Sequence, residues 1–164
     1  MPDTSDRENI LAPLGRVPSG IYILTIREET TGNQTGMLCS WVMQSGFEPP
    51  MVSVAVKHQR YVLDWLAAGA PFAINIVAER GKWLLSHFGK GFEPDDDAFG
   101  ELAIEQGPGG LTLLVEDIVG HLICEPVSHA DSGDHRVYLA RVVDGALRDD
   151  EPPMVHIRNS GKYY

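Results

Sequence analysis

Short runs of β-branched and aromatic residues recur along this chain, and Gly, Pro, Asn or Asp stands between most of them. Such runs are typical of β-strands joined by turns. The sequence has no repeated alternation of strand and helix, so the strands should pair mainly antiparallel. The pattern predicts a mainly β fold, an antiparallel barrel that is closed or partly closed. The expected strands cover residues 21–26, 51–56, 72–77, 111–115, 118–127, 136–143 and 154–157.

Two helical segments are inserted early among these strands. They cover residues 59–68 and 79–88, and each is followed by a Gly that can end a helix. In the first segment Val62 and Leu66 fall on one side, as in a helix that packs against a sheet. The sequence therefore predicts a β-barrel with two short inserted helices.

The length of 164 residues suits one domain with a full core. We expect residues 10–164 to form that domain and residues 1–9 to be a flexible polar tail. Residues 91–110 and 128–135 are rich in polar residues and Gly, and we expect them to be connections between regular elements. The sequence contains no internal repeat and no sign of a domain boundary.

The overall charge and the cysteines bear on partners and compartment. A net charge of −10 argues against a nucleic acid or an anionic membrane as partner, because such surfaces attract a basic excess. The chain begins with a polar, acidic stretch that lacks an apolar signal core, and it has no apolar run long enough to span a bilayer. Cys39 and Cys124 are expected to be reduced thiols. The sequence predicts a cytoplasmic protein.

Residues 36–61 contain the most informative chemistry. A loop of small residues leads through Pro49 and Pro50 into an apolar strand, after which Lys57 and Arg60 follow. Basic side chains beside free backbone amides suit an anion, and the apolar surface next to them suits a flat ring. The pattern indicates a site for an aromatic cofactor that carries phosphate, although Lys57 and Arg60 could also be ordinary solvated charges.

Metal and nucleotide-loop motifs are not supported. The acidic run at residues 95–97 lacks the alternating ligands and the Gly of a calcium loop. The six histidines do not have zinc-site spacing. Residues 107–110 are rich in Gly, but they precede a strand and lack the Lys of a phosphate-binding loop. We expect a turn there and no metal site in the protein.

Six short motifs follow one another along the chain, at residues 19–25, 36–41, 49–50, 72–76, 133–135 and 161–163. In this order they resemble the flavin reductase-like domain, an FMN-binding split barrel of the Greek-key type. Three further stretches, at residues 40–44, 54–57 and 155–158, are similar to the C-terminal flavin reductase module of cyanobacterial flavodiiron proteins. The resemblance implies a homodimer that binds FMN, with FAD as the alternative.

The resemblance also implies site residues. The loop at residues 38–44 would lie along the flavin ring and contact it largely through backbone groups, residues 56–61 would hold the phosphate, Asn75 would lie near the flavin, and His135 would lie on the open side where a nicotinamide stacks. Many relatives have Ser or Thr hydroxyls around residues 59–62 that this chain lacks. The implied cofactor-binding residues are Leu38, Cys39, Ser40, Trp41, Gln44, Val56, Lys57, Arg60, Tyr61 and Asn75.

For four of these residues the sequence leaves a plainer role open. Cys39 suits a small buried position better than redox chemistry. Asn75 stands in an apolar strand, where its side chain could satisfy a neighbouring backbone group. Trp41 could flank a ring or only pack, and His135 could be a locally bonded turn residue.

Together these observations predict an NAD(P)H-dependent flavin reductase. Hydride would pass from NADH or NADPH to the flavin, and reduced flavin would then serve oxygen, free flavin, a monooxygenase or an iron protein. An acid–base dyad is not expected, because the cofactor performs the chemistry. The alternative is a non-enzymatic FMN electron-transfer protein without a nicotinamide site. A third hypothesis is a dimeric barrel that has lost its flavin site.

Overall fold

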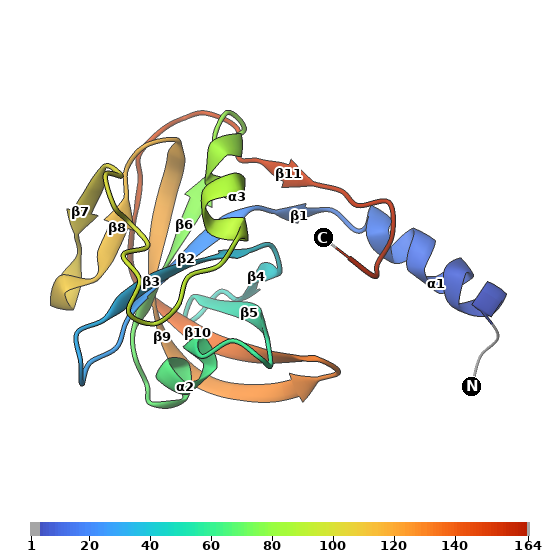
Figure 1. Cartoon of the computed structure of the whole chain (residues 1–164), viewed down its shortest axis with the longest axis horizontal. Helices are drawn as coiled ribbons and strands as arrows, with labels where there is room; N and C mark the ends of the chain where they lie inside the picture. Colours follow the sequence, from blue (N-terminus) through green and yellow to red (C-terminus); the bar gives the residue numbers. More distant parts are fainter. Residues whose placement is uncertain (1–3, 164) are drawn as a thin grey trace.

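One antiparallel sheet of seven strands forms the body of the computed structural model, which describes residues 4–163 (Figure 1). Its strand order is β3-β2-β6-β9-β10-β5-β4. The edge strands β3 and β4 do not pair with each other in this part of the chain, so the barrel is split rather than closed. The predicted fold class is confirmed. The strands of the sheet are β2 (Tyr22–Arg27), β3 (Gln34–Cys39), β4 (Val42–Gly46), β5 (Met51–Lys57), β6 (Phe72–Val77), β9 (Ile118–Ser132) and β10 (His135–Leu147).

Short strands and helices lie outside this sheet. Two further strand pairs, β1 with β11 and β7 with β8, stand outside it. No helix within residues 4–163 has both the length and the apolar character needed to cross a bilayer. These elements are β1 (Ser19–Gly20), β7 (Ile104–Gln106), β8 (Thr112–Leu114), β11 (Val155–His156), α1 (Thr4–Arg16), α2 (Val62–Ala67), α3 (Lys82–Gly89) and the 3₁₀ turn η1 (Pro108–Gly110).

The alternation of side chains along β5 explains how the sheet builds its core. Val52, Val54 and Val56 point inward and are at most 4% exposed, whereas the residues between them are half-buried. In a strand, successive side chains face opposite sides of the sheet, so one face is apolar and enclosed. The inward valines pack with Phe72 and Tyr138 in the larger core cluster.

The second predicted helix is α3, which packs against one side of the sheet. Leu84 and Phe88 are 1% exposed and pack in a second cluster with Ile23. The ring of Phe88 lies directly on Gly36 of β3, where a Cβ atom would clash with it. A residue without a side chain at this point lets the helix approach the strand closely.

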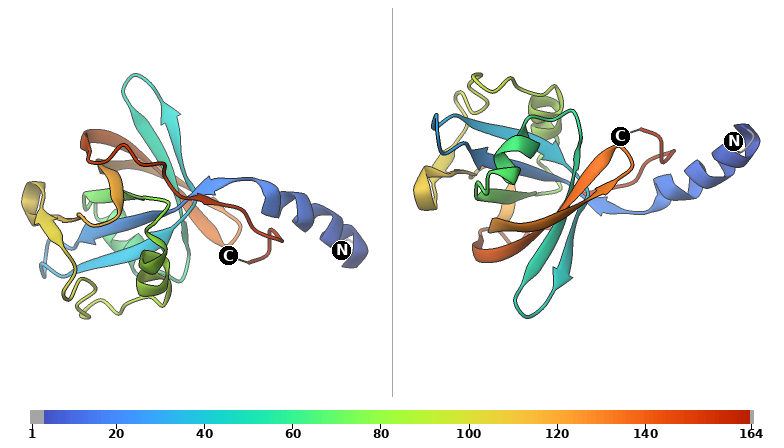
Figure 2. Two further views of the ribbon diagram at one scale, coloured as in Figure 1. Left: turned by 90° about the horizontal axis from the view of Figure 1, so that it is seen from above. Right: turned by 90° about the horizontal axis from the view of Figure 1, so that it is seen from below.

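Both ends of the chain form an arm that projects from the barrel (Figures 1 and 2). We call residues 4–20 and 155–163 the terminal arm. The amide of Arg158 donates to the carbonyl of Gly15 (2.8 Å), and the amide of Gly161 donates to that of Leu11 (2.6 Å). A flexible polar tail was predicted at residues 1–9, but the chain is helical from Thr4, and residues 1–3 lie outside the described residues. The helix is held by contacts with the far end of the chain, which local sequence does not reveal.

Two segments predicted as connections or loops are instead strands. Residues 128–135 were expected to be a connection, but β9 runs to Ser132 and β10 begins at His135, so only Gly133 and Asp134 turn the hairpin. The hairpin is exposed, and its polar side chains hid a ladder made by backbone groups. Similarly, the small-residue loop expected at residues 38–44 is the end of β3, two linking residues and the start of β4.

Candidate functional site

A cleft of about 620 Å³ lies between the terminal arm and one face of the sheet. We call this face the outer face and define it by Met43, Ser53, Ala55 and Val137, which face one another across β4, β5 and β10. All four residues line the cleft. Its size falls in the range of small-molecule sites, and its walls are largely apolar. The cleft therefore suits a flat aromatic ligand.

Trp41 forms part of the cleft wall where β3 passes into β4. Its carbonyl accepts a hydrogen bond from the amide of Ala55 (3.0 Å), which fixes the linking residues against β5. The indole ring lies 4.8 Å, centroid to centroid, from the imidazole of His135 at a tilt of 49°. The guanidinium carbon of Arg158 lies 5.3 Å from the indole centroid. Trp41 therefore contacts both the predicted nicotinamide-side residue and a cation of the terminal arm.

His135 is held by its neighbour in the hairpin turn. Its Nδ1 lies 2.7 Å from Oδ1 of Asp134, and this hydrogen bond keeps the pKa of Asp134 below its usual value. An ionised carboxylate only accepts, so Nδ1 carries the proton and Nε2 remains as the second ring nitrogen. His135 lies opposite Lys57 in the pairing of β10 with β5. Trp41, His135 and Lys57 thus come together at one end of the outer face, although His135 does not itself line the cleft.

Two polar side chains of the predicted loop line the cleft. Ser40 is 2% exposed, and its Oγ has no hydrogen-bond partner among residues 4–163. Buried hydroxyls are normally paired, so this oxygen is a candidate partner for a ligand. Gln44 is exposed, and its Nε2 donates to the carbonyl of Gly46 (3.3 Å). The cleft thus has a few polar groups in an apolar surround.

Three predicted site residues turn their side chains toward the core. Cys39 is buried, and burial raises the pKa of its thiol to about 12, so it remains protonated near neutral pH. Val56 is 1% exposed in the larger core cluster, and Leu38 packs against the cluster under α3. These side chains do not line the cleft, so any contact from these positions to a ligand would come from the backbone.

Asn75 lies inside the barrel, away from the cleft. Its Nδ2 donates to the carbonyl of Ile23 (2.9 Å) and to Oγ1 of Thr25 (3.2 Å), and its Oδ1 accepts from the amide of Leu114 (3.0 Å). The side chain therefore connects β2, β6 and β8. This arrangement matches the plainer role left open above, and a role beside a flavin stays a prediction.

The remaining predicted residues line a different, narrow crevice between β3 and α2. Arg60 and Tyr61 line it with residues 35–37 and Phe92. The hydroxyl of Tyr61 lies 2.9 Å from the carbonyl of Phe92 and 3.0 Å from Oγ1 of Thr35. Lys57 does not line this crevice, although the amide of Arg60 donates to the carbonyl of Lys57 (3.0 Å) in the turn that joins them. A shared phosphate site for the two stays a prediction.

One wall of the cleft comes from the C-terminal segment, which crosses the end of the sheet. Pro153, Met154 and Val155 line the cleft. Backbone hydrogen bonds attach the segment to the end of β6, from the amide of Glu79 to the carbonyl of Pro152 (3.0 Å) and from the amide of Met154 to that of Val77 (2.9 Å). Sequence analysis did not predict this wall, because it depends on pairing between distant segments.

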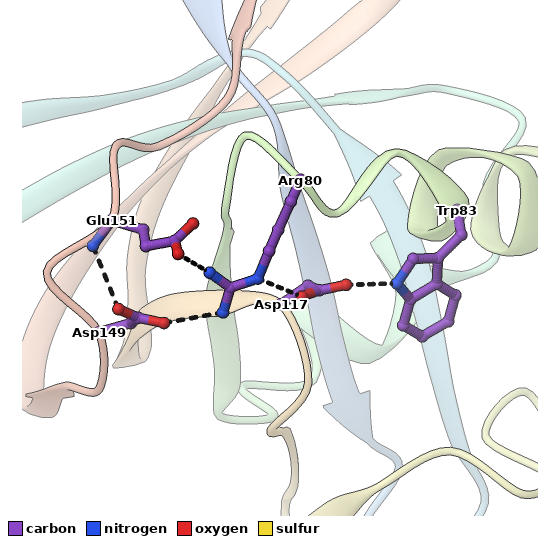
Figure 3. A network of polar contacts seen from close by, with 5 residues as sticks. All are labelled: Arg80, Trp83, Asp117, Asp149 and Glu151. Atoms are coloured by element: carbon purple, nitrogen blue, oxygen red, sulfur yellow. Dashed lines mark hydrogen bonds and ion pairs between the residues drawn. The ribbon is translucent and has the colours of Figure 1, made fainter.

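A cluster of charges around Arg80 holds the same segment in place (Figure 3). Nε of Arg80 lies 2.6 Å from Asp117, and its Nη2 lies 2.8 Å from Asp149. Glu151 is the third carboxylate on this guanidinium. The indole nitrogen of Trp83 donates to the second oxygen of Asp117 (2.7 Å), which connects the cluster to α3. The cluster fixes the segment where it enters the cleft wall.

The comparisons with known proteins agree with this geometry. The family model described as "Flavin reductase like domain" matches residues 14–163. The chain belongs to this family. Diflavin flavoprotein A 1 of Synechocystis sp. is 34% identical to it over 155 residues, which are 92% of this chain and 26% of that protein. Putative diflavin flavoprotein A 5 of Nostoc sp. is 32% identical over 154 residues, 92% of this chain and 26% of that protein.

This flavin reductase-like chain therefore spans about a quarter of the length of the curated relatives it matches. The predicted resemblance to the domain, and to the corresponding module of the diflavin proteins, is confirmed. Among solved structures, an NADH:FAD oxidoreductase of Streptomyces globisporus superposes with a TM-score of 0.83 at 22% identity, covering 96% of this chain and 92% of that one. At this identity the likeness establishes the fold.

Proposed function

We propose that this chain is an NAD(P)H-dependent flavin reductase that uses FMN, with FAD as the alternative. The observation that supports this most is the cleft, whose wall places Trp41 against His135 in a chain of this family. The family predicts a flavin, and the cleft offers a surface on which a flat ring can lie. One similar solved structure, the Streptomyces enzyme, is described as a complex with NAD and FAD fragments.

The residues present fit a flavin ring. The volume of about 620 Å³ and the apolar wall suit a three-ring heterocycle, and Tyr22 and Trp41 offer aromatic surface. The hydroxyl of Ser40 and the amide of Gln44 can hydrogen-bond to the polar edge of such a ring. The tyrosine ring lies against Gly20, where a Cβ atom would overlap it, so Gly20 keeps this side of the cleft open.

The bound flavin would supply the hydride-accepting chemistry, and the chain would bind and orient it. In this proposal His135 contributes to the nicotinamide side. Asp134 fixes the proton of its imidazole at Nδ1, and Trp41 packs against its ring. A general acid or base at the reacting carbon is not required for hydride transfer.

The phosphate would be bound by Lys57 or Arg60 with nearby backbone amides. Both side chains are exposed, and of the two only Arg60 lines the crevice. Lys57 lies at the end of the outer face, whereas Arg60 lies over the crevice at β3 and α2. Each is therefore a separate candidate for the phosphate, and their single variants can be compared.

The second candidate is a non-enzymatic FMN electron-transfer module. It is favoured by one observation, that the chain matches only about a quarter of the diflavin flavoproteins, so its counterpart there is one part of a larger protein. Such a module would receive electrons from a partner rather than from a nicotinamide. The rate at which NADH or NADPH is oxidised in the presence of FMN distinguishes the reductase from the electron carrier. This rate is measured as the loss of nicotinamide absorbance. Turnover far above the protein-free rate supports the reductase, and a rate equal to that background supports the carrier.

A homodimer and an electron acceptor complete the proposal. Met43 and Leu139 on the outer face are 66% and 39% exposed, and Val155 on the terminal arm is 65% exposed. Apolar surface of this kind is typical of an interface, and a second copy of the chain is its proposed occupant. Reduced flavin would pass to oxygen, free flavin, a monooxygenase or an iron protein. The buried, protonated thiols of Cys39 and Cys124 agree with a reducing, cytoplasmic location.

A further inference from the structure

The described lining of the cleft carries positive charge only. Among the described residues that line it, Arg158 is the only charged one, and all the others are apolar or neutral polar. The chain as a whole carries a net charge of −10. Because the described lining of the cleft has a guanidinium and no carboxylate, it favours a ligand with negative charge.

Arg158 is anchored through its backbone and through its side chain. Its backbone amide donates to the carbonyl of Gly15 (2.8 Å), and its Nη1 donates to the carbonyl of Tyr163 (3.3 Å). Its guanidinium carbon lies 5.3 Å from the centroid of the Trp41 ring. The side chain is half-buried, so water screens its charge less than that of an exposed arginine. Arg158 is thus a positioned charge beside the aromatic wall.

The two oxidation states of a flavin differ in charge at the ring. The oxidised ring is neutral, whereas the two-electron reduced ring that has lost its N1 proton carries a negative charge spread over N1 and the C2 carbonyl. The phosphate of FMN is present in both states. A cation that contacts the phosphate therefore strengthens the binding of oxidised and reduced flavin equally. A cation that contacts the ring strengthens the binding of the reduced flavin more.

We propose that Arg158 makes this cleft bind the reduced, anionic flavin ring more tightly than the oxidised ring. This rests on the function proposed above and adds a residue that determines which redox state the protein retains. The physical cause is the attraction between a fixed guanidinium and the charge that the ring gains on reduction. The consequence is a bound flavin that is easier to reduce than free flavin.

The test compares the affinities of oxidised and reduced flavin in the intact chain. The dissociation constant of oxidised FMN comes from fluorescence titration, and the midpoint potential of the bound flavin comes from an anaerobic titration against a reference dye. Arg158→Gln should lower the preference for reduced flavin about tenfold, and Arg158→Lys should keep most of it. Arg7→Gln, which removes one positive charge from α1 outside the cleft, should leave the preference at the wild-type value.

Repeating the titrations with riboflavin, which lacks the phosphate, locates the effect. The same shift with riboflavin supports an action on the ring, whereas a shift confined to FMN assigns Arg158 to the phosphate and overturns the proposal. Unchanged preference in Arg158→Gln also overturns it.

The proposal can also be tested on the wild-type protein, so that the result does not depend on whether a variant folds. The N1 pKa of bound reduced flavin should lie below that of free reduced flavin, and an equal or higher pKa overturns the proposal. If the wild-type chain binds no flavin in either state, the proposed function fails and this inference fails with it. If the wild-type chain binds flavin and NADH reduces it, but the preference for reduced flavin is the same in Arg158→Gln, only this inference fails.

Discussion

The imidazole of His135 packs against the indole of Trp41, with 4.8 Å between the two ring centroids. One residue follows the hairpin turn of β9 and β10, and the other links β3 to β4. The contact joins the segment predicted to face a nicotinamide to the segment predicted to face a flavin. A disturbance at either ring should therefore affect the other.

Replacing His135 tests the nicotinamide side. His135→Ala should slow flavin reduction by NADH roughly tenfold, because the hydride donor loses a positioning contact, while flavin affinity changes little. Stopped-flow reduction of bound flavin measures this rate. His129→Ala is the control, since His129 lies on the same hairpin but packs against Tyr138 instead. A rate equal to that of the wild type would remove His135 from the reaction.

Replacing Ser40 tests whether its buried hydroxyl binds a ligand. Ser40→Ala should weaken flavin binding roughly fivefold, the effect of one neutral hydrogen bond of about 1 kcal/mol. The flavin-free protein should unfold at the same temperature or slightly higher, because the substitution removes a buried oxygen that has no partner among the described residues. Fluorescence titration and thermal unfolding give the two values. A less stable protein with unchanged affinity would make Ser40 a structural residue.

The two candidate phosphate cations can be separated by single variants. Whichever of Lys57→Ala and Arg60→Ala removes the phosphate contact should weaken FMN binding about tenfold and leave riboflavin binding unchanged. Lys90→Ala is a matched control, because Lys90 lies over Phe92 near the same crevice. If neither single variant nor the double variant alters FMN affinity, both residues leave the site.

The Arg80 cluster should control both stability and the shape of the cleft. Arg80→Met leaves Asp117, Asp149 and Glu151 close together without their cation, so we expect a lower unfolding temperature and weaker flavin binding. Added salt should narrow the difference in unfolding temperature, because the cluster is partly exposed. Arg141→Met, at an exposed position of β10, is the control. Equal unfolding temperatures for Arg80→Met and the wild type would contradict this role.

The same cluster predicts a pH dependence. A hydrogen bond from Trp83, and then one from Arg80, lowers the pKa of Asp117, and Arg80 lowers that of Asp149. Carboxylates with a lowered pKa in the folded state stabilise it above the ordinary Asp value of about 3.9. This stabilisation is lost as pH falls through the lower folded values. The stability difference between wild type and Arg80→Met should therefore be full near neutral pH and shrink below about pH 4.

Local sequence patterns predicted five of the seven strands of the main sheet, in whole or in part, but not its edge strands β3 and β4. Apolar residues alternate in β5 because one face of this strand is enclosed, and β6 is apolar almost throughout because both of its faces are enclosed. The bounds of both strands lie within one residue of the predicted bounds. The polar hairpin after residue 127 was missed, because an exposed ladder depends on backbone pairing rather than on apolar side chains. Pairing of that kind leaves little trace in side-chain character.

The cleft was less predictable than the fold. Ser40, Trp41 and Gln44 were named from motifs, and all three line it. Arg158 could not be assigned, because its position over Trp41 depends on the terminal arm folding back along α1. Asn75 illustrates the opposite case, since a polar residue in an apolar strand looks the same in sequence whether it binds a ligand or a backbone group.

The most direct test of the central claim is the visible absorption spectrum of the protein after FMN is added and the excess removed, followed by anaerobic NADH. We predict a retained flavin spectrum that bleaches rapidly with NADH or NADPH, and that does so more slowly in His135→Ala. Retained flavin that neither nicotinamide bleaches would contradict the reductase and favour the electron carrier. A protein that retains no flavin and does not accelerate nicotinamide oxidation with free FMN would contradict both.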